Sequence, residues 1–330
     1  MTMQAAVLRR HGAPPEFGPR PEPHRGAGQA LVRVTAAPIN PLDLLCASGT
    51  SYFGAPALPY VPGTQGVGVV QDADGLAAGQ RVWFSCEAGM RPGDGSLAQF
   101  CAIAESAALP LDGAVADDLA AALGLSAVAA WTALSWRGDL KPGEHVLVLG
   151  ASGTVGQVAV QAARLLGAGR VIAACRDPHG RARAAELGAD AVADLTAPRG
   201  GDEVAVLADR LADACGGTVD LVLDPVWGPP AQAALRVMSP GGRLVNLGSS
   251  AAADAVIGSA GLRSGMLSLI GYTNNALSPE RKAAAFATVL SHAAAGRLDA
   301  DREVLPLGQV ADGWSRCGTA PHRRAVMIPP

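Results

Sequence analysis

The chain has 330 residues and a formal net charge of −3, with 49% hydrophobic and 17% charged residues. These fractions are typical of a globular protein and exclude a disordered or fibrous chain. The charge balance lacks the basic excess of a nucleic-acid-binding or membrane-surface protein, so we expect neither kind of partner. Because one hydrophobic core stops growing at roughly 250–300 residues, the length predicts two domains.

The six cysteines are scattered, without a C-x-x-C pair or a Cys/His cluster at the spacing of a zinc site. We interpret them as small buried side chains of a protein in a reducing compartment. The first residues lead into a strand-like run and lack the long apolar core of a signal peptide. These features predict a cytoplasmic protein.

Residues 119–136 form an uncharged run of 18 residues, which is long enough for a membrane helix. Most of the run is alanine, with Gly124, Ser126, Thr132 and Ser135 inside it, so its tendency to insert into lipid is weak. We therefore predict a buried helix of a soluble protein.

The first third of the chain is rich in strand patterns. Apolar or alternating runs at residues 5–8, 29–36 and 66–71 are separated by Gly and Pro clusters, and residues 79–84 form a turn followed by a strand. Many short strands with turns between them predict a compact, mainly antiparallel unit.

After residue 117 the pattern changes to alternating strands and helices. Asp117 and Asp118 are suited to begin an Ala-rich helix that extends to residue 133. The alternation over the following residues predicts a right-handed, doubly wound parallel sheet. The expected strands are 145–149, 171–174, 191–193, 219–224 and 242–247, and the expected helices are 155–166, 181–187 and 230–238. A helix at 279–295 and a strand at 324–328 end the chain, and we expect this strand to return to the first domain.

A glycine-rich turn directly follows the strand at 145–149 and opens a helix. This is the context of a dinucleotide-binding fingerprint, in which small residues let the backbone approach a pyrophosphate at the helix N-terminus. The loop is one residue longer than G-x-G-x-x-G, so an ordinary strand–turn–helix remains the alternative. The residues expected to bind the cofactor here are Gly150, Ala151, Ser152, Gly153, Thr154, Val155 and Gly156.

The end of the next strand bears on the choice between NAD and NADP. An acidic residue there accepts hydrogen bonds from the ribose 2′-hydroxyl of NAD, whereas an arginine suits the 2′-phosphate of NADP. The strand-end residue is Cys175, and Arg176 follows it. This favours NADP, with Cys175 and Arg176 in the cofactor site. Asp177 keeps NAD or dual use open, because a strand end shifted by one residue places it near the ribose.

Several short motifs, in this order and spacing, resemble the medium-chain dehydrogenase/reductase superfamily, in particular its zinc-free quinone oxidoreductase branch. The resemblance covers essentially the whole chain and implies an α/β fold with two domains. Residues 1–122 and 270–330 would form a GroES-like, mainly antiparallel β catalytic domain, and residues 123–269 a Rossmann domain that binds NADP. It also implies a homodimer, for which residues 244–271 would extend the sheet across a two-fold axis. The motifs are residues 37–43, 62–68, 143–153, 185–190, 239–243 and 323–327.

The chain departs from the zinc-dependent members at their metal ligands. Asn40 stands where those enzymes have a Cys three residues before Asp43, and Gly63-Thr64-Gln65 stands where they have Gly-His-Glu. Amide and hydroxyl groups are poor zinc ligands beside thiolate and imidazole. We therefore predict a site without zinc and expect only a structural role for Thr64 and Gln65.

A site without a Lewis acid is poorly suited to alcohol oxidation, because nothing stabilises the alkoxide. An electron-poor carbon of a quinone or an α,β-unsaturated carbonyl instead accepts hydride directly from NADPH, and hydrogen-bond donors stabilise the resulting anion. The expected function is an NADPH-dependent quinone or enone reductase. Reduction of an enoyl thioester or a biosynthetic intermediate, and non-catalytic NADPH binding, are the alternatives.

The resemblance implies three catalytic candidates. Asn40 would lie near the nicotinamide and polarise a carbonyl or hold a water, unless it only forms the turn before Pro41. Tyr52 would donate a proton, as in related enoyl-thioester reductases, unless it only packs at a cleft rim. Thr132 would approach the nicotinamide, unless its hydroxyl only bonds back to a helix carbonyl.

Further cofactor contacts are expected where predicted parallel strands end, on the side where ligands bind. The pocket walls would come from loops around Tyr52, 83–95 and 257–273, which makes the substrate the least predictable feature. The additional residues expected to bind the cofactor are Val226, Leu247, Gly248, Ser249 and, near the C-terminus, Arg324.

Overall fold

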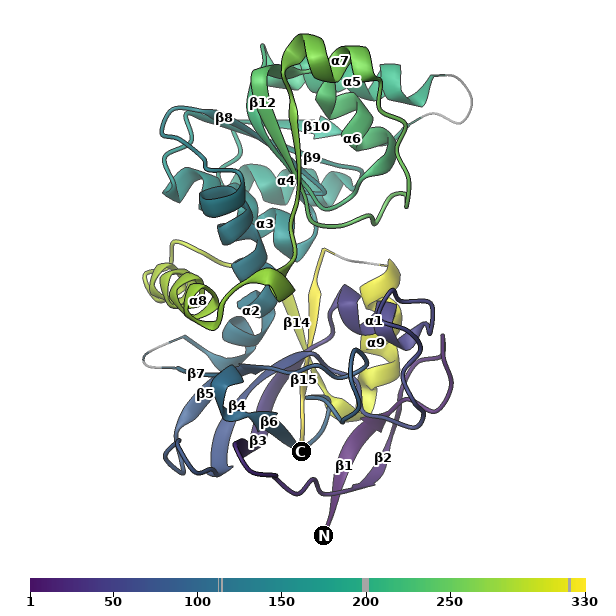
Figure 1. Cartoon of the computed structure of the whole chain (residues 1–330), viewed down its shortest axis with the longest axis vertical. Coiled ribbons are helices and arrows are strands. Elements are labelled where there is room, and N and C mark those ends of the chain that lie inside the picture. The colour runs from purple at the N-terminus through teal and green to yellow at the C-terminus, as the bar shows by residue number, and fades with distance from the viewer. Residues whose placement is uncertain (112, 114, 198–201, 320–321) are drawn as a thin grey trace. The chain divides into compact units, whose positions relative to one another are not determined.

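The computed structural model describes residues 1–111, 113, 115–197, 202–319 and 322–330. The chain divides into two compact units, Met1–Leu125 with Ala300–Pro330, and Ser126–Asp299 (Figure 1). The sequence places the boundaries after residues 122 and 269, whereas the units divide after 125 and 299. Asp299, the last residue of the second unit, exchanges two hydrogen bonds with the side chain of Gln161 in the same unit, at 2.7 and 2.9 Å.

The first unit is built around a sheet with strand order β14-β15-β3-β4-β5-β7, in which β6 also pairs with β3. The neighbouring strands are antiparallel except for β14 and β15, which are parallel. β1 and β2 form a separate antiparallel pair. The strands are β1 Thr2–Val7, β2 Glu16–Pro21, β3 Gln29–Pro38, β4 Gln65–Asp72, β5 Arg81–Ser85, β6 Phe100–Ala104, β7 Ala108–Pro110, β14 Arg302–Pro306 and β15 Arg324–Ile328.

Two short helices, α1 (Pro41–Ala47) and α9 (Val310–Thr319), belong to this unit. α1 follows β3 after a turn, and β15 pairs with the end of β3, so the C-terminal strand does return to the first domain as predicted. The core beneath the sheet contains Leu8, Ile39, Phe84, Leu97 and Met327. Because β15 braces the end of β3, the C-terminal segment supports the turn that carries Asn40.

The second unit contains a parallel sheet with strand order β10-β9-β8-β11-β12-β13. This is the order of a dinucleotide-binding fold, in which ligands bind at the carboxyl ends of the strands. The central strand β8 has four consecutive fully buried residues, as expected for a strand covered on both faces. The strands are β8 His145–Leu149, β9 Arg170–Cys175, β10 Ala191–Asp194, β11 Val219–Asp224, β12 Met238–Asn246 and β13 Ser268–Gly271.

Helices cover both faces of this sheet (Figure 1). They are α3 Thr154–Leu165, α4 Pro178–Glu186, α5 Glu203–Cys215, α6 Gly228–Leu235 and α7 Ser259–Gly265. Another helix of this unit, α8 Pro279–Ala294, lies away from the sheet (Figure 1). The helix predicted at 230–238 ends earlier, because Met238 already pairs with Val219 as the first residue of β12. The predicted α/β architecture, with an antiparallel-sheet domain and a Rossmann domain, is confirmed.

The uncharged run forms α2 (Asp117–Thr132), which continues as a π-helical turn at Ala133–Arg137. These residues are long and apolar enough to cross a membrane, but 72% of their most apolar window is buried inside the protein, as in the core helix of a soluble protein. The helix is interrupted at Gly124, whose φ of 26° and ψ of −126° are not helical. The break occurs beside the side chain of Gln65.

Candidate active site

Asn40 lies in a buried turn between β3 and α1 and is 5% exposed. Its backbone N–H donates to Asp43 Oδ2 at 2.7 Å, and Pro41 opens the helix directly after it. Asn40 thus does form the turn before Pro41. Its side-chain amide, however, contacts buried polar groups, so the turn is not its only role in the fold.

Asn40 belongs to a continuous chain of buried amide and hydroxyl groups. Gln65 Nε2 donates to Asn40 Oδ1 at 3.2 Å, and Asn40 Nδ2 donates to Thr64 Oγ1 at 3.4 Å. Gln65 Oε1 accepts hydrogen bonds from Trp83 Nε1 at 3.1 Å and from the backbone N–H of Leu125 at 2.7 Å. Thr64 and Gln65, for which the sequence predicts only a structural role, are therefore in direct contact with the candidate catalytic amide.

Asp43 lies at the other end of this series of hydrogen-bonded side chains, beside Asn40 and Thr64, and is 1% exposed. Its Oδ1 accepts from the backbone N–H of Thr64 at 2.9 Å, which complements the bond from Asn40 to Oδ2. Burial raises the pKa of Asp43 to about 6, although these hydrogen bonds and the charge of Arg324 favour the ionised form. The turn around Asn40 is therefore built on a buried carboxyl group whose pKa lies above the usual range for aspartate.

Arg324, which the sequence assigns to the cofactor, lies in β15 and is 6% exposed. Its Nη1 donates to the carbonyl of Ile39 at 2.7 Å, one residue before Asn40. Burial lowers the pKa of this guanidinium, and the charge of Asp43 opposes that shift. These contacts support the Asn40 turn, and the cofactor contact of Arg324 stays a prediction.

Tyr52 lies in the turns after α1 and is 78% exposed. Its ring centroid is 4.1 Å from that of Phe53, and no hydrogen bond to its hydroxyl occurs among the described residues. Partial burial, with a contribution from Cys46, raises its pKa above the usual value for tyrosine. This placement matches a tyrosine at a rim, and its role as a proton donor stays a prediction.

The glycine-rich turn connects β8 to α3 at the carboxyl edge of the parallel sheet. Gly150 has a φ of +64°, and a Cβ on Gly156 would lie 2.6 Å from the Cα of Ala151, so neither position accommodates a side chain without strain. The hydroxyl of Thr154, at the start of α3, is buried and has no hydrogen-bond partner within the described residues. A bare helix N-terminus approached by glycines fits a pyrophosphate, so these residues suit a dinucleotide.

The structure at the end of β9 distinguishes between Asp177 and Arg176, the two residues that could bind the adenosine ribose or its 2′-phosphate. Asp177 caps α4, because its Oδ1 accepts from the backbone N–H of His179 at 3.2 Å and its Oδ2 from that of Gly180 at 3.0 Å. Cys175 is 2% exposed, and burial raises the pKa of its thiol, so it presents no charge. Arg176 is exposed, and its guanidinium makes no hydrogen bond or ion pair within the described ranges. The carboxylate is thus engaged in the fold, while the arginine is available.

Further along the same edge, the turn after β11 contacts the glycine-rich turn. A Cβ on Gly150 would lie 2.8 Å from Val226 Cγ1, so Val226 packs directly over that glycine. Leu247 donates its backbone N–H to the carbonyl of Asp224 at 2.9 Å, and a Cβ on Gly248 would lie 2.6 Å from the Pro225 carbonyl. Three of the four residues predicted here are therefore clustered beside the glycine-rich turn. Ser249 lies exposed just beyond them.

Asp224 organises this turn and is completely buried. Its Oδ1 accepts from the backbone N–H groups of Val226 at 3.0 Å and Trp227 at 2.8 Å. Its Oδ2 accepts from Asn246 Nδ2 at 2.9 Å, which ties β11 to β12. Burial raises the pKa of Asp224, and Trp227 adopts a φ of 59°, which is strained for a bulky residue.

Thr132 joins a second polar cluster, at the end of β13. Its hydroxyl lies 2.6 Å from the carbonyl of Val128, as the helix-bonding alternative predicts, and 2.6 Å from the hydroxyl of Tyr272. The Tyr272 hydroxyl also lies 2.5 Å from Asn274 Oδ1. Burial raises the pKa of Tyr272 to about 12, so this hydroxyl stays protonated near neutral pH. Sequence reasoning places Tyr272 only in a variable pocket loop and misses its contact with Thr132.

The described residues contain no group of three or more His, Cys, Asp or Glu side chains arranged to hold a metal ion. At the positions of the superfamily's metal ligands, the side chains of Asn40 and Thr64 bond to each other. Four cysteines are buried, and burial raises the pKa of Cys46 and of Cys215 to about 11, so both thiols stay protonated.

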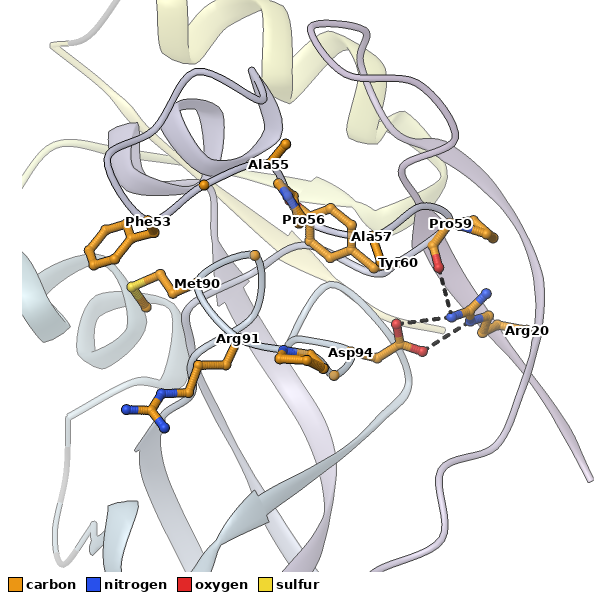
Figure 2. A pocket seen from close by; sticks show the side chains of 14 residues that line it. Arg20, Phe53, Ala55, Pro56, Ala57, Pro59, Tyr60, Met90, Arg91 and Asp94 are labelled. Atoms are coloured by element: carbon orange, nitrogen blue, oxygen red, sulfur yellow. Dashed lines mark hydrogen bonds and ion pairs between the residues drawn. The ribbon is translucent and has the colours of Figure 1, made fainter.

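A cavity of about 400 Å³ opens in the first unit between the loops at residues 53–60 and 89–94 (Figure 2). Phe53, Met90 and several prolines line it, and Arg20 closes one end through two hydrogen bonds to Asp94 at 3.0 and 3.1 Å. Both loops fall within the regions where the sequence predicts variable pocket walls.

Comparison with known families matches residues 26–116 to the alcohol dehydrogenase GroES-like domain and residues 154–290 to the zinc-binding dehydrogenase family. The chain belongs to the medium-chain dehydrogenase/reductase superfamily. The resemblance inferred from the motifs is thereby confirmed. The match described as zinc-binding covers neither Asn40 nor Thr64.

Within the superfamily, the chain is 32% identical to part of a phenolphthiocerol/phthiocerol polyketide synthase of Mycobacterium tuberculosis. That match covers 91% of this chain but only 13% of the synthase polypeptide. The quinone oxidoreductase of Rattus norvegicus is 31% identical, over 70% of this chain and 66% of the enzyme. The quinone oxidoreductase of Thermus thermophilus, solved alone and with NADPH, is 29% identical with a TM-score of 0.81, over 99% of this chain and 100% of that one.

Proposed function

We propose that this protein is an NADPH-dependent, zinc-independent oxidoreductase that reduces a quinone or a related α,β-unsaturated carbonyl. The observation that carries this proposal is the buried chain of amides and hydroxyls around Asn40. It presents an amide N–H of Asn40, backed by Thr64 and Gln65, at the positions where zinc-dependent members of the superfamily place thiolate and imidazole. The similarity to quinone oxidoreductases supports the same reaction class.

The choice of NADPH rests on the end of β9. The carboxylate of Asp177 already accepts two backbone hydrogen bonds as the cap of α4, which leaves it poorly placed to bind a ribose 2′-hydroxyl. The guanidinium of Arg176 is exposed beside it, and a guanidinium matches a phosphate in charge and in hydrogen-bond geometry. We infer that Arg176 binds the 2′-phosphate.

When bound, NADPH would supply a hydride for the electron-poor carbon of the substrate, and a proton from solvent would complete the reduction. The chain's own residues hold the cofactor and stabilise the charge that develops on the substrate oxygen. The glycine-rich turn and the N-terminus of α3 would hold the pyrophosphate, and the Thr132 hydroxyl would contact the nicotinamide. The Asn40 amide donates a hydrogen bond to the substrate carbonyl oxygen, a kind of contact that typically contributes about 10²–10³-fold in kcat where an anion forms.

An enoyl thioester is the second candidate substrate, because the match to a polyketide synthase extends over 91% of this chain. An α,β-unsaturated thioester accepts hydride at the same type of electron-poor carbon as an enone. For this substrate Tyr52 is the proposed proton donor. Its exposed position leaves room for a large thioester substrate beside it.

We also propose that the protein is a cytoplasmic homodimer. β13 is the outer strand of the parallel sheet, and its residues Ser268, Leu269 and Gly271 are exposed. Met266, just before the strand, is 70% exposed. An uncovered strand edge next to exposed apolar side chains supports pairing with a second copy.

NADPH oxidation measured separately with phenanthrenequinone, a 2-enone and crotonyl-CoA tests the proposed function. Turnover of the first two supports the quinone or enone reading, and turnover of crotonyl-CoA alone supports the thioester reading. NADPH binding without turnover of any acceptor would indicate a non-catalytic protein. Asn40→Ala is expected to lower kcat about 100-fold with the preferred acceptor, and full activity of this variant would contradict the role of Asn40.

A further inference from the structure

Gln65 is completely buried at the start of β4, directly behind Asn40. Burying an uncharged amide is unfavourable unless its groups are hydrogen-bonded. Gln65 satisfies this condition on both sides, with Trp83 and Leu125 at its oxygen and Asn40 at its nitrogen. Its contacts therefore determine how the two amides are oriented.

The orientation of Gln65 follows from the chemistry of its partners. An indole N–H and a backbone N–H are donors only, so both groups must face Oε1 of Gln65. Nε2 then faces Asn40, and because Nε2 is a donor, the atom of Asn40 that it meets must be the acceptor Oδ1. The amide of Asn40 is thereby turned with Nδ2 away from Gln65.

The other end of the chain of polar groups requires the same orientation. The carboxylate of Asp43 is an acceptor, and the hydroxyl of Thr64 donates to it. The oxygen of Thr64 is then left to accept from Asn40 Nδ2. One N–H of Asn40 is used in this bond, and the second has no partner within the described part of the protein.

The helix α2 is interrupted where it passes the side chain of Gln65. α2 breaks at Gly124, and a Cβ on this glycine would overlap Gln65 Oε1. The break also leaves the N–H of Leu125 without its regular helical geometry and directs it to Gln65 Oε1 at 2.7 Å. A glycine inside a helix costs about 1 kcal/mol relative to alanine, so the interruption needs a compensating interaction, and Gln65 supplies one.

We propose that Gln65 is a positioning residue that fixes the Asn40 amide with its free N–H toward the substrate, so that the site selects a hydrogen-bond acceptor such as a carbonyl oxygen. This inference rests on the proposed function, in which Asn40 contacts the substrate. It assigns to Gln65 a role that goes beyond packing: the residue determines whether Asn40 presents a donor or an acceptor.

Gln65→Glu tests this role through the pH dependence of kcat. The introduced carboxyl group, when protonated, donates to Asn40 Oδ1 as the Gln65 amide does, whereas in its ionised form it only accepts and draws Asn40 Nδ2 toward itself. We expect kcat of the variant to be within about threefold of wild type at low pH and to fall at least tenfold as the pH rises through the pKa of this carboxyl group, which burial raises. Wild type should lack this fall.

The charged groups of this network are Asp43 on α1 and, facing Asp43, Arg324 on β15. The contacts from β5 and α2 come from an indole and a backbone N–H, which do not titrate here. Asp43 and Arg324 are present in both proteins. Comparing the pH profile of kcat of Gln65→Glu with that of wild type therefore removes their contribution. If kcat of Gln65→Glu changes with pH in parallel with kcat of wild type, the proposal is overturned. This holds whether the variant is as active as wild type or equally weaker at every pH.

Two further variants complete the test. Gln65→Met fills the same volume without a donor, so it should lower kcat at every pH while leaving Kd for NADPH within about twofold; unchanged kcat in this variant would also overturn the proposal. Asn40→Ala separates the two claims. If Asn40→Ala retains full kcat, the proposed function of Asn40 fails. If it loses kcat while Gln65→Glu follows the wild-type profile, only the role of Gln65 fails. Near-ultraviolet circular dichroism establishes that each variant is folded.

Discussion

The hydroxyl groups of Thr132 and Tyr272 lie 2.6 Å apart, although 140 residues separate them in the chain. Tyr272 directly follows β13, and its backbone N–H donates to the carbonyl of Asn246 at 2.9 Å. The pair therefore lies at the edge of the parallel sheet where the strands end, which is also the edge that carries the glycine-rich turn. The Thr132 hydroxyl, which we propose to contact the nicotinamide, thus lies between the Val128 carbonyl and the Tyr272 hydroxyl.

Tyr272→Phe tests this relationship. The change removes the hydrogen bonds of the Tyr272 hydroxyl to Thr132 and to Asn274, so we expect a loss of about 2 kcal/mol in unfolding free energy and a roughly fivefold weaker Kd for NADPH. Because the pKa of Tyr272 is about 12, the effect on Kd should be the same at every pH between about 6 and 9. Fluorescence titration and chemical denaturation measure the two quantities.

Tyr60→Phe is the matched control, since the Tyr60 hydroxyl is buried without a hydrogen-bond partner in the described part of the chain. It should leave Kd for NADPH unchanged. Equal cofactor binding by Tyr272→Phe and wild type would show that Tyr272 does not position Thr132 for the cofactor.

Arg176→Ala should discriminate between the two cofactors. A charge-assisted hydrogen bond contributes about 1.5–3 kcal/mol, so kcat/KM for NADPH should fall roughly ten- to a hundredfold. The lost interaction with the 2′-phosphate lies far from the hydride that is transferred. Most of the change should therefore appear in KM rather than in kcat. kcat/KM for NADH should change little, because NADH has no 2′-phosphate.

Arg236→Ala removes another exposed arginine of the same unit, at the end of α6, and should change neither cofactor's constants. If wild type prefers NADH and Arg176→Ala has little effect, Asp177 rather than Arg176 binds the ribose, and the assignment to NADPH is wrong.

The elements that the sequence predicts well are those whose own residues determine them. β8, β11 and β15 are short apolar runs with clear boundaries, and their ends are predicted to the residue. α1 is missed because Asn40-Pro41 reads as a turn and the helix has only seven residues. α5 is missed although Val204, Leu207, Ala208 and Leu211 have the spacing of an amphipathic helix.

The site residues divide in the same way. The glycine-rich turn is local, so its position on a strand–turn–helix follows from the sequence. The contact of Gln65 with Gly124 depends on a helix break that an Ala-rich run does not reveal, because a single glycine is compatible with a continuous helix. The cap formed by Asp177 is equally hard to foresee, since its carboxylate suits either a ribose or a helix N-terminus until the start of α4 is known.

Asp43→Asn should change the pH dependence of stability. The pKa of Asp43 is raised from 3.8 to about 6 in the folded protein, so as the pH rises its carboxyl group ionises in the unfolded chain before it ionises in the folded protein. The unfolding free energy therefore falls as the pH rises from about 4 to 6. The shift corresponds to about 3 kcal/mol. Relative to Asp43→Asn, wild type should therefore lose about this much unfolding free energy over that interval. A constant difference between the two proteins across this range would show that the Asp43 pKa is not raised.

Leu269→Lys should separate the proposed dimer. Leu269 lies in β13 and is 38% exposed, and a lysine at a strand edge opposes pairing with a second copy. We expect light scattering to give twice the 33.2 kDa of one chain for wild type and a single chain for the variant. A monomeric wild type at micromolar concentration would contradict the dimer.

The central claim is that this chain reduces its substrate with NADPH and without zinc. The most direct measurement is the rate of NADPH oxidation with phenanthrenequinone by wild-type protein dialysed against a chelator, with metal content measured on the same sample. We expect full activity with far less than one zinc per chain, and a lower kcat/KM with NADH than with NADPH. Activity that disappears on chelation and returns with zinc, or about one zinc retained per active chain, would contradict this claim.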